Sequence, residues 1–447
     1  MGKMSIEPQK AETWLLENVV TVDFPTLSVS NASVRIENGV IAEVANAGGH
    51  EDVPRSQRVN CHGMLLLPAL VVGHTHLYSA LAPGMPPAKR QPENFVQILE
   101  EIWWKLDRAL DDEGVYYSAL VGAIRAAQCG VGTLVDHHAS PNAIAGSLDL
   151  VRNALARVGL RGVLCYEVTD RNGKDGARAG LEENARFIRN CPQDGRFSGL
   201  VGAHASFTLS DETLGALADL ADETRRGVHI HCAEANSDNE DSLRRCGKRV
   251  LGRLMEARIV RPGTVLGHCT HLMPEEVEVA YDHGCWIAHN CRSNMNNAVG
   301  YAPIESLARG RLALGTDGID HDLFAESRTA FFRMREARAR LPFHAPLHWL
   351  TGASQLASEN LGIPLGRVAK GYPADLLLLD YVPATPLTSS NFAGHWFFAI
   401  NAQHVHSLMV GGKWILRNRE LSDTTLQEEL ERARIVAQRM WQRFETL

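Results

Sequence analysis

Short apolar runs separated by longer segments of helical periodicity occupy the middle of the chain. From about residue 66 eight such runs recur, reading LLLPALVVGH, GTLVDHH, RGVLCYEV, GLVGAHA, GVHIHCAE, GTVLGHCT, CWIAHNC and LALGTDG. Amphipathic segments such as DEGVYYSALVGAIRAAQCG and SDETLGALADLADETRRG lie between several of them, and we expect Ser210 to cap the second helix. Strand–helix alternation repeated eight times predicts an α/β fold with a parallel (β/α)8 TIM-type barrel.

The two ends of the chain follow a different pattern. The first residues alternate short polar and apolar stretches around a Glu-Asn-Gly turn at 37–39, which predicts a β-hairpin. After about residue 346 a helical segment precedes the runs YPADLLLLD and VHSLMVGGKWILRN, and a polar helical tail starts at Thr424. We therefore expect a barrel over 67–372 beside a small β-sandwich domain. Residues 1–66 and 373–447 would form that domain, with the terminal helix included.

Composition and charge narrow the class of protein. Of 447 residues, 45% are hydrophobic and 22% are charged, as in ordinary soluble globular proteins. The net charge of -7 argues against a nucleic-acid or acidic-membrane surface, and no apolar run is long enough to span a bilayer. The nine scattered cysteines include no CxxC pair, and the N-terminus lacks the apolar core of a secretory signal. These features favour reduced thiols in a cytoplasmic protein and disfavour a cysteine-based zinc site.

The first apolar run ends in two histidines, His74 and His76. Because side chains alternate along a strand, both imidazoles point to the same side. In a (β/α)8 barrel the active site lies at the carboxyl ends of the strands, so both rings would face the barrel mouth. The alternative interpretation is a pair of hydrogen-bonded core histidines.

Further strands carry possible ligands at the same end. They are His229, His231 and Glu234 on the fifth strand, His268 and His271 on the sixth, and Asp317 on the eighth. A single histidine there is more often structural, and an aspartate before glycine is more often a turn former. Four of the eight strands nevertheless end in such residues. Imidazole and carboxylate together suit Zn²⁺, Fe²⁺ or a similar divalent ion.

The motifs GHTHLYSAL, HIHCAE, GHC and LGTDG, in this order, resemble those of the amidohydrolase superfamily over nearly the whole chain. WWKLDRALDDE, VDHHASP, TDRN, RSNMNN and LGTDGI bring the resemblance nearest to the SsnA-type aminohydrolases, which look like cytosine, guanine and triazine deaminases. The resemblance implies specific roles. The metal ligands would be His74, His76, His231 and Asp317, and the catalytic residues would be Glu234, His268 and Asp317.

Three details of this assignment rest on spacing within the family pattern. His231 is preferred to His229 because the family places its catalytic glutamate three residues after the ligand; His229 is expected to support a ligand. The presence of His271 leaves the choice of His268 open. The fourth strand lacks the lysine that bridges two metals in binuclear members, and the nearby Lys174 lies in a Gly-rich loop. One ion is therefore expected, Zn²⁺ first and Fe²⁺ second.

Several residues near the predicted barrel mouth are candidates for substrate contact. They are His204 on the fourth strand, His137 and His138 after the second, His289, Arg292 and Asn294 after the seventh, and Asp320 and His321 after the eighth. For each, a structural role in the loop or core is the alternative. Trp103 and Trp104 could cover an aromatic substrate, although aromatic residues on a helix more often belong to the core.

The resulting prediction is hydrolytic deamination of a nitrogen heterocycle of purine, pyrimidine, pterin or triazine type. Asp317 would take a proton from the attacking water, and Glu234 would protonate a ring nitrogen. The alternatives are hydrolysis of a cyclic amide, hydrolytic dechlorination, or a barrel that has lost catalysis and serves as a scaffold. The expected partners are a small heterocyclic substrate and water, and the resemblance implies a homodimer or higher oligomer.

Overall fold

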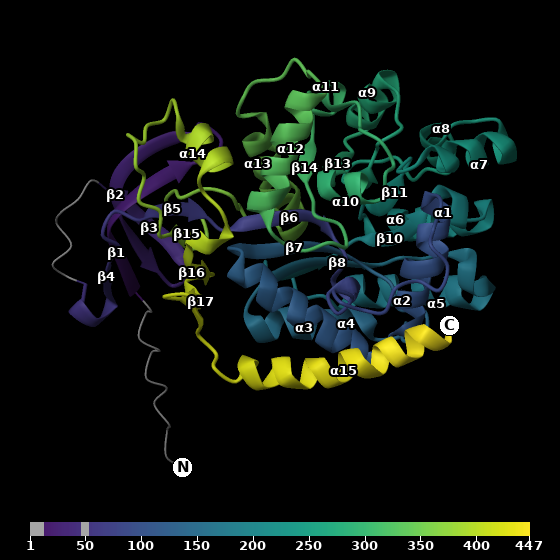
Figure 1. Ribbon diagram of the computed structural model, residues 1–447, viewed down its shortest axis with the longest axis horizontal. Coiled ribbons are helices and arrows are strands. Elements are labelled where there is room, and N and C mark those ends of the chain that lie inside the picture. Colours follow the sequence, from purple (N-terminus) through teal and green to yellow (C-terminus); the bar gives the residue numbers. More distant parts are fainter. Residues whose placement is uncertain (1–12, 46–52) are drawn as a thin grey trace, which may run out of the picture.

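The fold is a parallel barrel flanked by a mixed β-sheet (Figure 1). The computed structural model describes residues 13–45 and 53–447. Two runs of parallel strands form the barrel wall, β6 to β9 and β10 to β14. Parallel bridges between Thr75 and Asp317 and between Val168 and Ala203 join the two runs. The predicted TIM-type barrel is therefore confirmed.

Each of the eight predicted apolar runs contributes one barrel strand. The strands are β6 (Leu70–Thr75), β7 (Val131–His138), β8 (Arg161–Tyr166), β10 (Val201–Ala205), β11 (Val228–Cys232), β12 (Val265–His268), β13 (Trp286–His289) and β14 (Leu312–Leu314), with the short β9 (Phe197–Gly199) beside β8. Every position in these strands is buried. Parallel strands are covered on both faces by the helices that connect them, which explains their continuous apolar runs.

Helices connect the barrel strands or, in the case of α12 and α13, follow the last of them. They are α3 (Asp112–Gln128), α4 (Ser147–Val158), α5 (Gly173–Asn190), α6 (Asp211–Thr224), α7 (Asn236–Cys246), α8 (Val250–Glu256), α9 (Pro274–Asp282), α10 (Cys291–Asn296), α11 (Ile304–Leu307), α12 (Leu323–Glu336) and α13 (Ala345–Leu361). The expected cap of α6 is confirmed, because the Ser210 hydroxyl accepts a hydrogen bond from the Thr213 amide at 3.2 Å.

A helical segment between β6 and α3 departs from the regular barrel. It consists of α1 (Phe95–Ile98), a π-helical turn η3 (Leu99–Trp103) and α2 (Trp104–Ala109). A 3-10 turn, η2 (Leu77–Ser79), precedes it and follows β6 directly. Single π-helical turns are frequent at functional sites. This segment contributes to the pocket described below.

Strands from both ends of the chain share one nine-stranded sheet. Its members are β1 (Thr13–Asp23), β2 (Ser28–Glu37), β3 (Val40–Ala45), β4 (Arg58–Asn60), β5 (Leu65–Pro68), β15 (Leu376–Leu379), β16 (Val405–Val410), β17 (Lys413–Arg417) and β18 (Glu420–Leu421). The two ends meet where Leu67 lies antiparallel to Leu377. The predicted hairpin at 37–39 is present, and a second hairpin joins β16 to β17 through Gly411 and Gly412.

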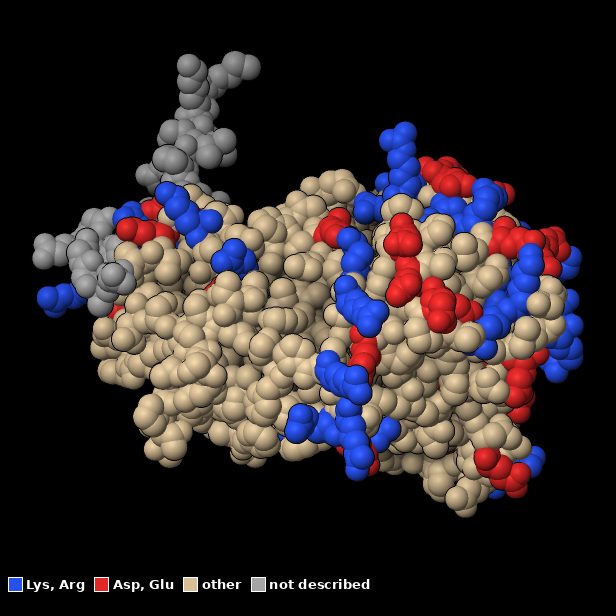
Figure 2. All heavy atoms as spheres, turned by 90° about the horizontal axis from the view of Figure 1, so that it is seen from above, with Lys and Arg blue, Asp and Glu red and all other residues tan. Residues whose placement is uncertain are grey.

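Two helices follow β15, namely α14 (Phe392–Phe398) and the long terminal α15 (Leu426–Thr446). In Figure 1, α15 runs along the barrel beneath α3 and α2, well away from the sheet that precedes it. Within the described ranges, no helix has the length and apolarity needed to cross a membrane. On the face shown in Figure 2, basic and acidic side chains are interspersed.

Candidate metal and catalytic site

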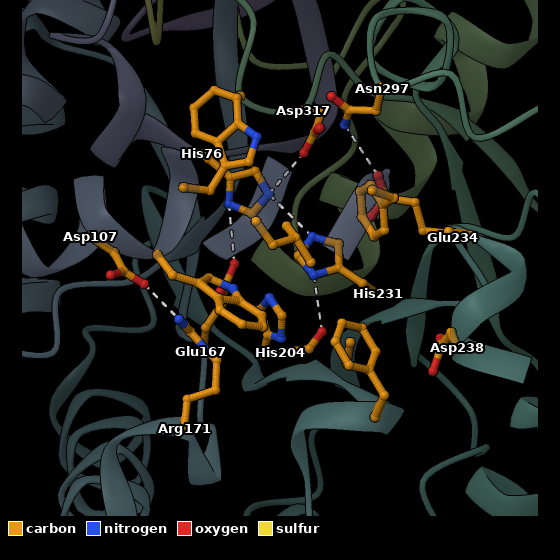
Figure 3. Close-up of a pocket in the computed structure, with 18 of the residues that line it drawn as sticks. His76, Asp107, Glu167, Arg171, His204, His231, Glu234, Asp238, Asn297 and Asp317 are labelled. Carbon is orange, nitrogen blue, oxygen red and sulfur yellow. Dashed lines mark hydrogen bonds and ion pairs between the residues drawn. The ribbon is translucent and has the colours of Figure 1, made fainter. Parts of the chain in front are cut away.

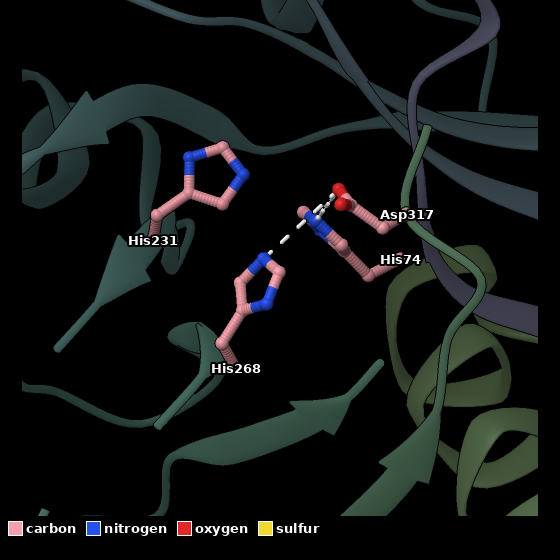
Figure 4. Close-up of side chains that lie close together, drawn as sticks. All are labelled: His74, His231, His268 and Asp317. Carbon is pink, nitrogen blue, oxygen red and sulfur yellow. Dashed lines mark ion pairs between the residues drawn. The ribbon is translucent and has the colours of Figure 1, made fainter. Parts of the chain in front are cut away.

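Four ligand-type side chains converge at the carboxyl ends of the barrel strands (Figure 4). One donor atom each from His74, His231, His268 and Asp317 lies within 4.8 Å of the others. His76 belongs to the same group, because its Nε2 atom lies 2.9 Å from Asp317 Oδ1 and 3.2 Å from His231 Nε2. The structure thus brings together all four predicted metal ligands and His268.

The geometry of this cluster suits a divalent ion. A tetrahedral ion with ligands at 2.0–2.2 Å separates its donor atoms by about 3.4 Å. Here His74 Nε2 lies 3.3 Å from Asp317 Oδ1, close to that spacing. The Nε2 atoms of His74 and His268 are also buried without a hydrogen-bond partner in the described part of the chain. Buried nitrogen atoms left without partners are expected where an ion completes the site.

Each imidazole in the cluster is held from behind at its Nδ1 atom. The partners are His229 Nε2 for His74 at 2.8 Å, the His137 carbonyl for His76 at 2.6 Å, the His204 carbonyl for His231 at 3.0 Å, and Asn294 Oδ1 for His268 at 2.8 Å. Such contacts fix the ring orientation and direct Nε2 toward the centre of the cluster. His229 therefore contacts His74, one of the predicted ligands, which is the supporting position expected for it.

Asp317 sits in a constrained position just past β14. Its backbone φ is +53°, a left-handed conformation uncommon outside glycine, and its amide donates to the His74 carbonyl at 3.1 Å. The Ser293 hydroxyl hydrogen-bonds to its Oδ2 atom. Burial opposes ionisation of this carboxyl, but the adjacent imidazoles of His74 and His76 hold its pKa well below the usual range. Asp317 is therefore an anion facing the imidazoles.

Glu234 lies beside the cluster rather than within it. It follows β11, is 9% exposed, and its Oε2 atom lies 3.6 Å from His268 Nε2. Asn297 donates to its other oxygen at 3.4 Å. Burial raises the pKa of Glu234 to about 7. A carboxyl with this pKa carries a proton on a large fraction of molecules at neutral pH, as a general acid requires.

A pocket opens above the cluster, as Figure 3 shows. His76, His231, Glu234, Asp317 and the predicted contact His204 all line it. Apolar and aromatic side chains form much of the remaining wall: Tyr78, Phe95, Leu99, Trp103, Trp104 and Phe207. Both tryptophans therefore line the pocket, in a place where they could contact an aromatic substrate. Flat aromatic rings bind readily between such side chains.

The wall of the pocket also contains an ion pair, Arg171 with Asp107, beside Trp104. The Trp104 ring is 6.2 Å from the His204 ring, and the Arg171 guanidinium stacks 4.5 Å from the Trp104 ring. Arg171 donates to Asp107 Oδ2 at 2.9 Å, while Asp107 Oδ1 is buried without a partner in the described chain. A buried carboxylate thus holds the Arg171 guanidinium in this part of the pocket.

Four predicted substrate contacts do not line this pocket. His137 and His138 are fully buried, and the Nε2 atom of His137 faces the His229 carbonyl at 3.1 Å. Asn294 is 2% exposed because it turns inward to hold His268. His321 is also buried, at 4% exposure. Of the four, His137 contacts the backbone of β11 and Asn294 holds His268, whereas His138 and His321 are buried away from the pocket lining.

The other candidates are held in contacts of their own. His271 turns away from the cluster and bonds to the Val299 carbonyl at 2.6 Å, which leaves His268 as the sixth-strand member. Arg292 pairs with Asp320 and Glu326, so that loop is tied together internally. His289 is fully buried and outside the pocket lining. Lys174 pairs with Glu212 on the surface, and all nine cysteines are free thiols.

Glu167, which follows β8 directly, belongs to the site but was not among the residues predicted from the sequence. It is 2% exposed, and its Oε1 atom lies 3.0 Å from His137 Nδ1 and 3.3 Å from His76 Nδ1. Burial disfavours its charge, but the neighbouring His137 holds its pKa well below the usual range. Asp107 and Arg171 were also missed, although they lie in the motifs WWKLDRALDDE and TDRN. The strand-end position of Glu167 was the available signal.

Comparisons with known proteins agree with this geometry. The model of the Amidohydrolase family matches residues 65–415. A 5-methylthioadenosine/S-adenosylhomocysteine deaminase of Syntrophomonas wolfei is 28% identical over 396 residues, covering 86% of this chain and 88% of the relative. A 5'-deoxyadenosine deaminase of Methanobrevibacter smithii is 29% identical over 412 residues, covering 89% and 90%.

Solved structures share the fold. A zinc-bound adenosine deaminase from Xanthomonas campestris superposes with a TM-score of 0.82 at 23% identity, covering 96% of this chain and 98% of that one. A zinc complex of an atrazine chlorohydrolase from Arthrobacter aurescens gives 0.80 at 19% identity, covering 95% and 99%. Together with the family match, these results show that the chain belongs to the amidohydrolase family and is an aminohydrolase acting on carbon–nitrogen bonds.

Proposed function

We propose that this enzyme hydrolytically removes an amino group from a carbon of a nitrogen heterocycle. The observation that carries the proposal is the position of Glu234. Its buried carboxyl lies 3.6 Å from His268 and lines the pocket, next to the ligand cluster but outside it. A proton donor in that place can reach a ring nitrogen of a bound substrate without occupying the ion site.

Each residue of the site has a proposed role. His74, His76, His231 and Asp317 would hold the ion, which when bound supplies Lewis-acid activation of a water nucleophile. Asp317 would accept the proton of that water. His268 would hold the water through Nε2, since Asn294 occupies its Nδ1. Glu234 would protonate the ring nitrogen next to the attacked carbon and then assist departure of ammonia.

The lining of the pocket supports a flat substrate. Aromatic side chains such as Trp103, Trp104 and Phe207 offer faces and edges to a planar ring, and His204 offers a polar edge next to His231. We propose a purine, pyrimidine, pterin or triazine ring. The curated relatives are named as deaminases of adenosine derivatives, so adenine-type compounds head the panel to be tested.

We propose one divalent ion per chain, with Zn²⁺ preferred and Fe²⁺ second. Three imidazoles and one carboxylate are donors that suit either ion, and the water nucleophile would be a further ligand. The barrel strand β10 carries His204 and no lysine that could bridge a second ion. Two of the solved relatives are described with zinc, which supports the first choice.

Wider features of the protein are proposed on the same basis. The terminal segments 1–66 and 373–447 would form a β-sandwich domain beside a barrel of residues 67–372. The nine free cysteines fit a reducing, cytoplasmic compartment. We propose a homodimer or higher homo-oligomer, by analogy with relatives, with no nucleic-acid or membrane partner.

A second candidate reaction uses the same water nucleophile on a different leaving group. One structural relative is named as a chlorohydrolase, so removal of halide from a ring carbon, or opening of a cyclic amide, deserves testing beside deamination. A non-catalytic scaffold is disfavoured because the ligand cluster, Glu234 and the pocket are all present. The released product, ammonia, halide or an opened ring, separates the enzymatic candidates.

The proposal is tested by incubating the zinc-loaded protein with a panel of heterocyclic amines and measuring released ammonia. The panel holds adenine nucleosides, free purines, cytosine, pterins and aminotriazines, with chlorotriazines and cyclic amides for the alternatives. Glu234→Gln serves as the matched control, because it preserves the size of the side chain but cannot deliver a proton. Ammonia release by the native protein alone is expected. Halide release or ring opening without ammonia would overturn deamination.

A further inference from the structure

The terminal helix α15 contributes no residue to the pocket, although all of it is described. It packs on the barrel through one apolar face made of Leu426, Ala433, Val436, Met440 and Phe444. Near its carboxyl-terminal end, the side chains of Trp441 and Arg443 donate hydrogen bonds to backbone carbonyls of two other segments. Those two bonds carry the inference, which rests on the proposed function only for its consequence on substrate affinity.

Arg443 holds the segment that bears the pocket tryptophans. Its Nε atom donates to the Ala109 carbonyl at 2.6 Å, and its Nη1 atom pairs with Asp111 at 3.1 Å. Ala109 is the last residue of α2, five residues after Trp104 and two after Asp107. Asp111 in turn caps α3 by accepting from the Gly114 amide at 2.8 Å. Arg443 therefore fixes the point where the helical segment 95–109 turns into α3.

Trp441 holds the other outer segment, the chain that follows the ligands of β6. Its indole Nε1 donates to the Leu81 carbonyl at 2.9 Å. Two residues earlier, the Ser79 hydroxyl bonds to the Gly318 carbonyl at 2.9 Å, beside the proposed ligand Asp317. Tyr78 of the same segment lines the pocket. Trp441 is thus bonded to the same short segment, residues 77–85, that lines the pocket through Tyr78 and contacts the loop of Asp317 through Ser79.

We infer that α15 is a positioning element of the active site: Trp441 and Arg443 hold the two segments that form the outer pocket wall, residues 77–85 and 95–109. Substrate affinity then depends on a helix that does not contact the substrate. The proposed metal ligands lie on strands β6 and β11 or shortly after β6 and β14, and these strands have their own parallel pairing. Loss of either bond should loosen the wall and leave the ligand cluster in place.

The test compares R443A and W441F with R434A in the full-length zinc-loaded protein. Arg434 lies on the same helix and, among the residues that the structure describes, pairs with Glu431 alone, one turn away, so it is a matched arginine control. Hydrogen exchange followed by mass spectrometry reports on the two wall segments and needs no substrate. Steady-state kinetics and bound zinc are measured on the same preparations. R443K is included in case R443A does not fold, because it keeps the charge near Asp111 but lacks the Nε donor.

We expect R443A or R443K to speed exchange in 95–109, and W441F in 77–85, by about tenfold, the scale of one lost hydrogen bond to a carbonyl. KM should rise by about tenfold while kcat changes less than about threefold and one zinc ion stays bound. R434A should match the native protein. Unchanged exchange in both segments, loss of zinc, or a fall in kcat at constant KM would overturn the inference. Absence of turnover in the native protein would count against the proposed function, and the exchange result would still decide whether α15 holds the wall.

Discussion

The Nε2 atoms of His76 and His231 lie 3.2 Å apart at the mouth of the barrel. Both rings donate from Nδ1 to backbone carbonyls, those of His137 and His204, so two Nε2 lone pairs would face each other if both rings were neutral. Lone pairs at this distance repel unless a cation lies between them. The arrangement is therefore built around a positive charge, either a proton or a metal ion.

This relationship predicts that metal binding releases a proton. Burial lowers the pKa of His76, but the hydrogen bond and charge of Asp317 raise it to about 9, whereas burial holds the pKa of His231 well below the usual range. Below pH 9 the ion must displace the proton from His76, so apparent affinity for Zn²⁺ should rise about tenfold per pH unit toward pH 9. Titration calorimetry at pH 7.5 in buffers of different ionisation enthalpy should show about one proton released. A heat that is independent of the buffer would contradict this.

Removing a proposed ligand should lower zinc affinity more than removing a residue that only contacts a ligand. His231→Ala should abolish most zinc binding, because it removes a direct ligand. His229→Ala removes only the 2.8 Å contact to His74 Nδ1 and should weaken binding by about 10–100-fold. Elemental analysis and chelator competition measure both, with one equivalent of zinc expected in the native protein. The reverse order of effects would show that His229 is the ligand.

Glu167 should affect the zinc affinity of the site although it is not one of the proposed ligands. Its carboxylate faces Nδ1 of both His76 and His137, so Glu167→Gln should weaken zinc affinity by about 10–100-fold. Glu183→Gln is a suitable control. Glu183 is equally buried but bonds to the backbone amides of Gly146 and Leu148 on another part of the barrel. Equal zinc affinity in the two variants, measured by chelator competition, would remove Glu167 from the site.

Two further variants, Glu234→Gln and Asp317→Asn, should distinguish loss of proton transfer from loss of metal binding. Glu234→Gln should retain about one zinc ion and lose about 10²–10⁴-fold in kcat, the usual contribution of a general acid. Asp317→Asn should lose zinc affinity as well as rate, because Asp317 contacts both His74 and His76. Zinc content and ammonia release are measured together. A zinc-free Glu234→Gln protein would make Glu234 a ligand instead.

The barrel and the nine-stranded sheet should depend on one buried ion pair. Arg161 of β8 donates to both oxygens of Asp375, at 2.7 and 2.9 Å, and both side chains are less than 10% exposed. Asp375→Asn leaves the arginine charge uncompensated and should lower the free energy of unfolding by about 3–5 kcal/mol. Removing the exposed partner of Lys174 by Glu212→Gln should change it by less than about 1 kcal/mol. Urea denaturation compares them, and equal midpoints would refute the distinction.

The sequence by itself determined the barrel and the end of it at which ligand-type side chains gather. Fully buried parallel strands need continuous apolar runs, so each strand is visible in isolation, and the period of two places His74 and His76 on one side. Because parallel strands end at the same edge, residues at their ends must meet whatever the loops do. That is why His231, His268 and Asp317 could be brought together from the sequence.

The tertiary structure alone decided which of the remaining polar residues face the pocket. Periodicity gives the direction of a side chain but not its depth, so His137 and Asn294 are equally plausible contacts in the sequence and are buried supports in the fold. The roles of Glu167, Trp441 and Arg443 depend on contacts between segments far apart in the chain. Such contacts are set by how helices and loops pack on the barrel, and no local pattern in the sequence encodes that packing.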